Sequence, residues 1–190
     1  MLQKMDFELV PFRNNDKIIS LMGKLDFSDG VVSVSYELTG NLEGLNWPES
    51  GPGQSRAYGL WEHTCLELFI GSVACDGYHE VNLSPAGNWN CFSFTDVRVG
   101  MKESDTLTLI SLESMETNKV ARLSAVLDFK RRLPDSLQIG LSAVIEMGSN
   151  LHYYALSHGS VPDFHAREHH TLRHPEQLHS RTDQVTRSNL

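Results

Sequence analysis

The segment 59–70 carries the densest group of side chains that could bind or transform a ligand. It places Trp61 and His63 directly before an apolar run, and it places Glu67 inside that run. If the run is a strand, Glu67 shares a face with His63 and Phe69, because alternate residues of a strand point to the same side. A carboxylate on a mostly apolar face needs a partner, since an unpaired buried charge is costly.

Arg98 is the candidate partner of Glu67, and two arrangements fit the sequence. The two side chains form a structural ion pair, or both face a pocket. A catalytic alternative uses His63, Glu67, Glu80 and Glu146 as acid and base in glycoside chemistry, which needs two carboxyl groups about 5 to 10 Å apart. The chain has no nucleophile elbow, P-loop or dinucleotide fingerprint, so ligand binding without chemistry is the preferred interpretation.

Histidines are concentrated near the end of the chain, where five of them fall within residues 165–179. In a helix, His165 with His169 and His170 with His174 would share faces at a spacing that can hold a divalent metal. No thiolate or carboxylate pattern completes a site. No metal site is therefore predicted, and these four residues are the candidate ligands if one exists; a solvated tail is the alternative.

The elements that would position these residues follow from a hydrophobic period of two. Residues 32–39, for example, alternate between apolar and polar side chains, which is typical of a strand with one buried face. Comparable patterns predict about nine strands, over residues 19–27, 32–39, 63–70, 78–84, 90–95, 106–113, 121–129, 137–147 and 151–157. Asp29-Gly30 and Ser84-Pro85-Ala86-Gly87 predict tight turns. Since no helical stretch could form crossovers, the pattern predicts an all-β fold, an antiparallel β-sandwich of about nine to eleven strands.

Two segments do not follow the hydrophobic period of two. Residues 46–59 form a loop rich in Pro and Gly, and Trp47 within it is predicted either to act as a lid or to fold back and plug the edge of the sandwich. After about Leu172 the chain is polar and has no period. We therefore predict one ligand-binding domain over residues 1–172 and a polar, disordered tail over residues 173–190.

Several motifs, in order along the chain, resemble a known family. They are the run from Gly59 to Ile70, the run from Tyr78 to Trp89, Arg98-Val99-Gly100-Met101, the run from Gly140 to Glu146, the run from Tyr153 to His158, and Pro162-Asp163-Phe164-His165. Together they resemble the DOMON-like domain family, which is related to family 9 carbohydrate-binding modules. The resemblance implies a β-sandwich with a ligand-binding face, and proteins of this type bind sugars, haem or related small ligands.

A sugar site combines aromatic faces for the C–H side of the ring with carboxylates, amides and Arg for its hydroxyl groups. The predicted ligand site consists of Trp61, His63, Glu67, Asn82, Trp89, Arg98, Glu146, Tyr154 and His158. The preferred function is a non-catalytic module that binds a carbohydrate or a sugar-containing metabolite. The alternatives are a haem- or metal-binding module of the same type and a glycan-acting enzyme.

Composition limits the partners. With 16 basic and 24 acidic residues the net charge is -8, which disfavours a nucleic-acid surface. No apolar run approaches the roughly 20 residues that cross a bilayer, and the first twelve residues lack the apolar stretch of a secretory signal. Three cysteines without a CxxC pair suit a reducing compartment. We expect a cytoplasmic protein and assign it no cofactor, with haem or a divalent metal as the alternatives. A homodimer formed through exposed sheet edges is also open.

Overall fold

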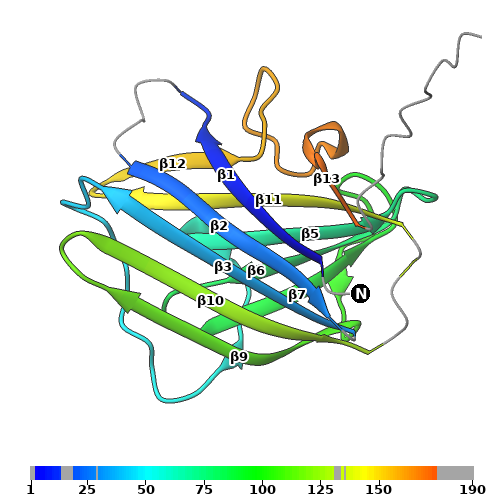
Figure 1. Ribbon diagram of the computed structural model, residues 1–190, viewed down its shortest axis with the longest axis horizontal. Helices are drawn as coiled ribbons and strands as arrows, with labels where there is room; N and C mark the ends of the chain where they lie inside the picture. The colour runs from blue at the N-terminus through cyan, green and yellow to red at the C-terminus, as the bar shows by residue number, and fades with distance from the viewer. Residues whose placement is uncertain (1–2, 14–18, 29, 131–133, 135, 175–190) are drawn as a thin grey trace, which may run out of the picture.

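A computed structural model describes residues 3–13, 19–28, 30–130, 134 and 136–174 of the chain as one continuous sheet that curls on itself (Figure 1). The path runs in the order β4 (Ser55–Arg56), β7 (Asn88–Phe94), β6 (Tyr78–Leu83), β5 (Cys65–Ser72), β11 (Leu137–Met147), β12 (Asn150–Ala155), β1 (Gln3–Pro11), β2 (Ile19–Ser28), β3 (Val31–Gly40), β10 (Val120–Phe129) and β9 (Leu107–Glu116). Off this path, β8 (Lys102–Glu103) pairs with β7 and β13 (Leu172–His174) pairs with β11. Two short 3-10 helices, η2 (Leu60–Glu62) and η3 (Arg167–His169), accompany the strands.

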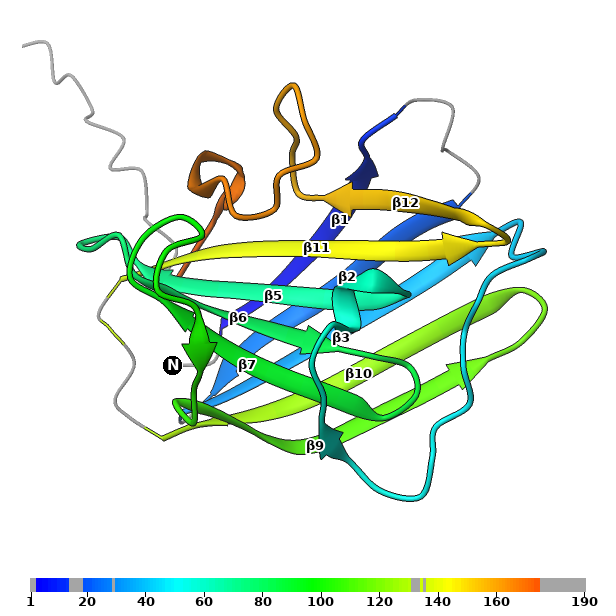
Figure 2. The ribbon, with the colours of Figure 1, turned by 180° about the vertical axis from the view of Figure 1, so that it is seen from behind.

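The first strand connects the two halves of the sheet. β1 pairs with β2 from Gln3 to Leu9, and at Val10 and Pro11 it pairs with β12. Figures 1 and 2 show the half formed by β1, β2, β3, β10 and β9 on one side and β11, β5, β6 and β7 on the other. The all-β class is confirmed. The predicted division into two separate antiparallel sheets is not confirmed, because β1 bonds to both halves and because β4 pairs with β7 in parallel.

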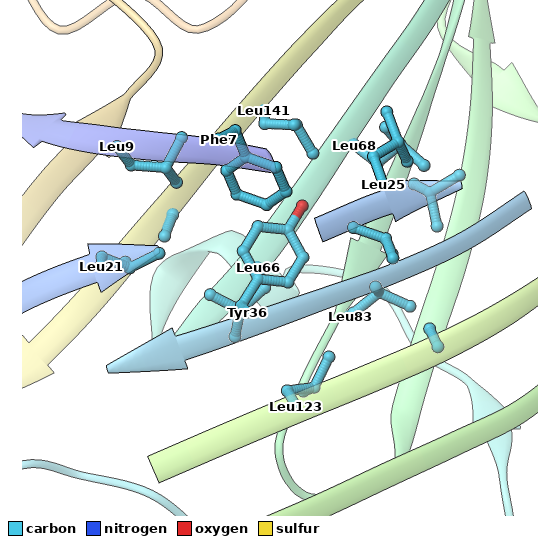
Figure 3. Packing of buried hydrophobic residues seen from close by; sticks show 14 of the residues in the cluster. Phe7, Leu9, Leu21, Leu25, Tyr36, Leu66, Leu68, Leu83, Leu123 and Leu141 are labelled. Atoms are coloured by element: carbon cyan, nitrogen blue, oxygen red, sulfur yellow. The ribbon is translucent and has the colours of Figure 1, made fainter. Parts of the chain in front are cut away.

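The main core lies between these two halves. From β3, Val32, Val34, Tyr36 and Leu38 are all buried, as the alternation in their sequence predicts. Leucines from β5 and β6 meet them from the opposite half (Figure 3). The Tyr36 hydroxyl donates a hydrogen bond of 2.7 Å to the backbone oxygen of Glu67, so a polar contact also spans the core.

The strands expected from the period of two are all present, with ends that shift by a few residues. The 84–87 turn is confirmed, since the Gly87 amide donates to the Ser84 oxygen at 3.0 Å and Gly87 has a φ of 91°. β2 and β3 pair as the expected hairpin, although Asp29 lies outside the described residues. β1 is the main element that the prediction lacked: Phe7 and Leu9 face the core, while the neighbouring Asp6 and Glu8 are exposed.

The two irregular segments are both tied to the sheet. Trp47 is 7% exposed and belongs to the core, and its Nε1 donates to Ser114 Oγ at 2.9 Å, so it plugs the sheet rather than covering a site. At the other segment, β13 pairs Leu172 with Ile139, so the predicted tail begins inside a strand. Residues 175–190, where disorder was expected, lie outside the described residues. Within the described part of the chain, no helix is long and apolar enough to cross a bilayer.

Candidate functional site

One half of the sheet has a second apolar face, on the side away from the main core. Phe69, Tyr78, Phe92 and Phe94 are buried there, with Trp61 and Phe164 packed against them. The helix η2 and the segment after β12 lie beside this half (Figure 2). Strands buried on both faces read as nearly continuous apolar runs, which explains the composition of β5.

A cavity of about 380 Å³ opens on this outer face, within the usual range of small-molecule sites. Strands β5, β6, β7, β11 and β12 supply its floor and one side. The rest comes from η2, the 95–101 loop and the 156–166 segment. The lining residues are Trp61, Glu67, Glu80, Phe94, Arg98, Met101, Val144, Tyr153, Pro162, Phe164 and His165.

Aromatic rings form much of the cavity wall and are held by one another. The rings of Phe94 and Tyr78 are stacked with centroids 4.9 Å apart and planes at 8°. Tyr153 meets Phe164 edge to face at 6.0 Å, and Trp61 meets Phe92 in the same way at 5.9 Å. These contacts fix the rings, so the wall offers preformed apolar surface.

Two buried carboxyl groups lie at the floor of the cavity. Glu67 is 2% exposed and accepts a hydrogen bond from Ser142 Oγ at 2.8 Å. Glu80 is 4% exposed and accepts one from Asn82 Nδ2 at 2.7 Å. Burial, together with the nearby Glu80 charge, raises the pKa of Glu67 to about 8, and burial raises the pKa of Glu80 to about 6. Near neutral pH the pair therefore holds about one proton and presents both a hydrogen-bond donor and an acceptor.

His165 closes the cavity above Glu80. Its Nδ1 is 2.6 Å from the Tyr78 hydroxyl and its Nε2 is 3.6 Å from Glu80 Oε2. Burial, and then the Arg98 charge, lowers the pKa of His165 to about 4, so the ring is neutral at physiological pH. With Nδ1 as the acceptor from Tyr78, the remaining N–H of His165 faces the Glu80 carboxyl group.

Arg98 lies at the rim, on a loop with unusual backbone. Its φ is 57°, in the left-handed region, and its amide donates to the Tyr78 hydroxyl at 3.2 Å. The guanidinium donates to Asp163 Oδ1 at 2.7 Å and so ties the 95–101 loop to the 156–166 segment. Glu67 and Arg98 therefore line the same cavity, and the ion partner of Arg98 is Asp163.

Of the predicted site residues, Trp61, Glu67 and Arg98 line the cavity. Asn82 lies behind it, where its side chain holds Glu80. His63 forms a separate polar contact with Glu146, 3.0 Å from Nδ1 to Oε2, beyond the lining residues. The structure thus gathers four of these six predictions around one site.

The other three predicted residues lie elsewhere. The side chains of Trp89 and Tyr154 belong to the main core, and Arg56 stacks over Trp89 at 4.5 Å. His158 lies 2.9 Å from the backbone oxygen of Val10 and holds the segment after β12 to β1. Tyr153 lines the cavity in place of Tyr154, because adjacent residues of β12 point to opposite faces.

The prediction also lacked several lining residues. Glu80 is predicted only as an acid or base of the catalytic alternative, and His165 only as a candidate metal ligand. Phe94, Tyr153 and Phe164 are not among the predicted site residues. The alternation of Tyr78, Glu80 and Asn82 on β6 is the signal that could have placed Glu80 beside Glu67, once their strands were paired.

The histidine pairs that a helix would have formed are absent from the described residues, because residues 167–169 make a single 3-10 turn followed by β13. His169 lies 2.9 Å from Ser157 Oγ, His170 packs on Phe69, and His174 stacks on Phe27. Among the described residues, no group of three or more His, Cys, Asp or Glu side chains could hold a metal ion.

The chain is similar in structure, and not in sequence, to known carbohydrate-binding proteins. No protein-family model and no curated protein matches the sequence. A crystal structure of a protein from Bacteroides uniformis ATCC 8492, provisionally described as carbohydrate-binding, matches with a TM-score of 0.61 and 11% identity, over 87% of this chain and 83% of that chain. A family 9 carbohydrate-binding module from Caldicellulosiruptor kristjanssonii, in complex with cellotriose, matches with a TM-score of 0.54 and 8% identity, over 80% of this chain and 72% of that chain. At these identities the likeness shows the fold alone.

Proposed function

We propose that this chain is a non-catalytic module that binds a carbohydrate or a sugar-containing metabolite in the outer-face cavity. The observation that carries the proposal is the composition of that cavity: fixed aromatic rings on its walls and a half-protonated carboxyl pair at its floor. Aromatic faces cover the C–H side of a sugar ring, while a carboxyl donor, a carboxylate acceptor and Arg98 satisfy hydroxyl groups in several orientations.

The fold supports this proposal, because a family 9 carbohydrate-binding module of similar fold has been solved in complex with cellotriose. We further propose that the chain belongs to the DOMON-like group related to family 9 modules and that it works in the cytoplasm. There the ligand would be a soluble glycan, a nucleotide sugar or a cell-wall precursor.

The test is calorimetric titration of the untagged protein with mono- and oligosaccharides and nucleotide sugars. Trp61→Ala and Arg98→Gln should each weaken binding about tenfold or more, since each removes a lining group. Met22→Ala and Arg122→Gln are matched controls on exposed positions of the other half, and both should bind like wild type. Failure of every sugar in the panel, or equal effects of the cavity and control variants, would refute the proposal.

A glycan-acting enzyme is the second candidate, because Glu67 and Glu80 have pKa values raised to different extents, the arrangement that acid and base catalysis needs. In that case the wild type would turn over a bound oligosaccharide, and Glu67→Gln would abolish turnover while retaining binding. A pure binding module shows no turnover in either protein. Haemin and zinc in the same panel test the cofactor alternatives.

A further inference from the structure

The floor of the cavity holds carboxyl groups without a cation in direct contact with them. Arg98, the cation at the rim, is held by Asp163 at 2.7 Å. His165 is enclosed by the rings of Phe69 and Phe94, at 5.4 and 5.1 Å, in surroundings that favour the neutral imidazole.

Neither floor carboxyl has a permanent cation against it. Among the residues that the structure describes, no Lys or Arg lies within ion-pair distance of Glu67 or Glu80. The Cys65 thiol behind them is also buried, and burial with the Glu67 charge raises its pKa well above the usual value, so it stays protonated. The hydrogen bonds from Ser142 and Asn82 come from neutral donors. The Arg98 charge lowers the pKa of both carboxyl groups, but it acts on them from the rim, without an ion pair.

The aromatic side chains of the cavity wall also favour a positively charged ligand. Trp61, Phe94, Tyr153 and Phe164 line it, and aromatic faces attract cations through their quadrupole, more strongly where water is excluded. Two buried carboxyl groups below and four aromatic rings around them form surroundings in which a cation gains, while an anion would be repelled.

We propose that the cavity takes an amino sugar, whose protonated amine lies between Glu67 and Glu80 while its ring packs against Trp61 and the neighbouring aromatic side chains. This inference rests on the proposed function and adds the charge of the ligand to it. On binding, the proton that the pair shares is released to solvent, and the ammonium supplies the cation in direct contact with the pair that Arg98, bound to Asp163 at the rim, does not supply. Its N–H groups then donate to both carboxylates.

The experiment is titration of the untagged protein with matched hexoses that differ at one substituent. Glucosamine, galactosamine and mannosamine are each compared with the parent hexose and with the N-acetyl derivative, in which the amine is neutral. At least one hexosamine should bind ten times more tightly than both of its neutral counterparts. Glu80→Gln should reduce that ratio towards one. Glu146→Gln, which removes a carboxylate outside the cavity, should leave it unchanged.

The outcomes separate this inference from the proposed function. Binding of neutral hexoses with equal or higher affinity overturns the inference and leaves carbohydrate binding intact. Binding of cyclohexylamine as tightly as any hexosamine shows an amine site without sugar recognition and overturns both. Failure of all nine sugars overturns the inference and counts against the proposed function as well. A wild-type preference that survives in Glu80→Gln and Glu67→Gln, both folded by their thermal midpoints, also overturns it.

Discussion

Replacing Glu67 with Gln should change how the stability of the protein depends on pH. Glu67 is buried, its pKa is about 8 in the folded chain, and the ordinary value of 4.5 applies once the chain unfolds. The folded protein therefore retains a proton that the unfolded chain releases between these values. Stability from this group is complete below pH 4.5 and is lost as the pH rises through 8.

The size of the effect follows from the two pKa values. Between them the free energy of unfolding changes by about 1.4 kcal/mol per pH unit, so Glu67 should cost the wild type about 3 kcal/mol between pH 6 and pH 9. Gln has the shape of the protonated acid and can still accept the hydrogen bond from Ser142. The stability of the variant relative to wild type should therefore rise by about 3 kcal/mol over this range.

Urea unfolding followed by tryptophan fluorescence, at pH 6, 7, 8 and 9 with reductant and constant ionic strength, measures this difference directly. Glu37→Gln, which removes an exposed carboxylate paired with Arg122, is the matched control and should keep the wild-type dependence on pH. In Glu80→Gln, the pH range over which stability is lost should move to lower pH, because the Glu80 charge is one cause of the raised pKa of Glu67. Parallel curves for wild type and Glu67→Gln would show that Glu67 is ionised throughout, and the account of the cavity floor would then be wrong.

Three further predictions concern the surroundings of the site. Burial lowers the pKa of His170 to about 4, so protonation of the unfolded chain should reduce stability as the pH falls from 6.5 to 4. His170→Gln should remove about 3 kcal/mol of that loss, measured by thermal unfolding across this range; an unchanged dependence of stability on pH below 6.5 would contradict it. A Cβ on Gly140 would overlap the His170 ring, so Gly140→Ala should destabilise by about 1–3 kcal/mol in urea unfolding, and a neutral effect would show that the 156–171 segment moves freely. Trp47→Ala should cost about 3–5 kcal/mol, whereas Ser114→Ala, which removes only its hydrogen-bond acceptor, should cost about 1 kcal/mol; equal losses would refute the role of Trp47 as a core plug.

The sequence predicts strands well where only one face is buried. In β3 and β10, one set of alternate residues is apolar and buried in the core, namely Val32, Val34, Tyr36 and Leu38 of β3 and Ala121, Leu123, Ala125 and Leu127 of β10. The strand β1 is missing from the prediction because its charged residues are compatible both with the outward face of a strand and with a solvated chain end. A hydrophobic period of two shows which side chains share a face, and the partner strand must also be known before the segment can be identified as a strand.

The site was also predictable in part from the alternation of side chains along the strands. The buried Glu67 and its need for a partner follow from its apolar face, and the structure confirms the burial. In β12 two tyrosines are adjacent, and the sequence does not show which of them faces the cavity; the prediction names Tyr154, whereas Tyr153 lines the cavity. The pairing of Arg98 with Asp163 joins loops that are 65 residues apart, and local spacing carries no information about such a contact.

The position of β1 between the two halves has a consequence for the kinetics of folding. Val10 and Pro11 pair with Ala155 and Tyr154, so closing the sheet requires contacts across about 145 residues of chain. Folding rates fall as contacts become less local, because the entropy of closing the loop is lost before the contact stabilises anything. The hairpins β2–β3 and β6–β7 can form early from neighbouring residues, while the join at β1 must come late. Folding should therefore be slow and end in one concerted step that closes the core.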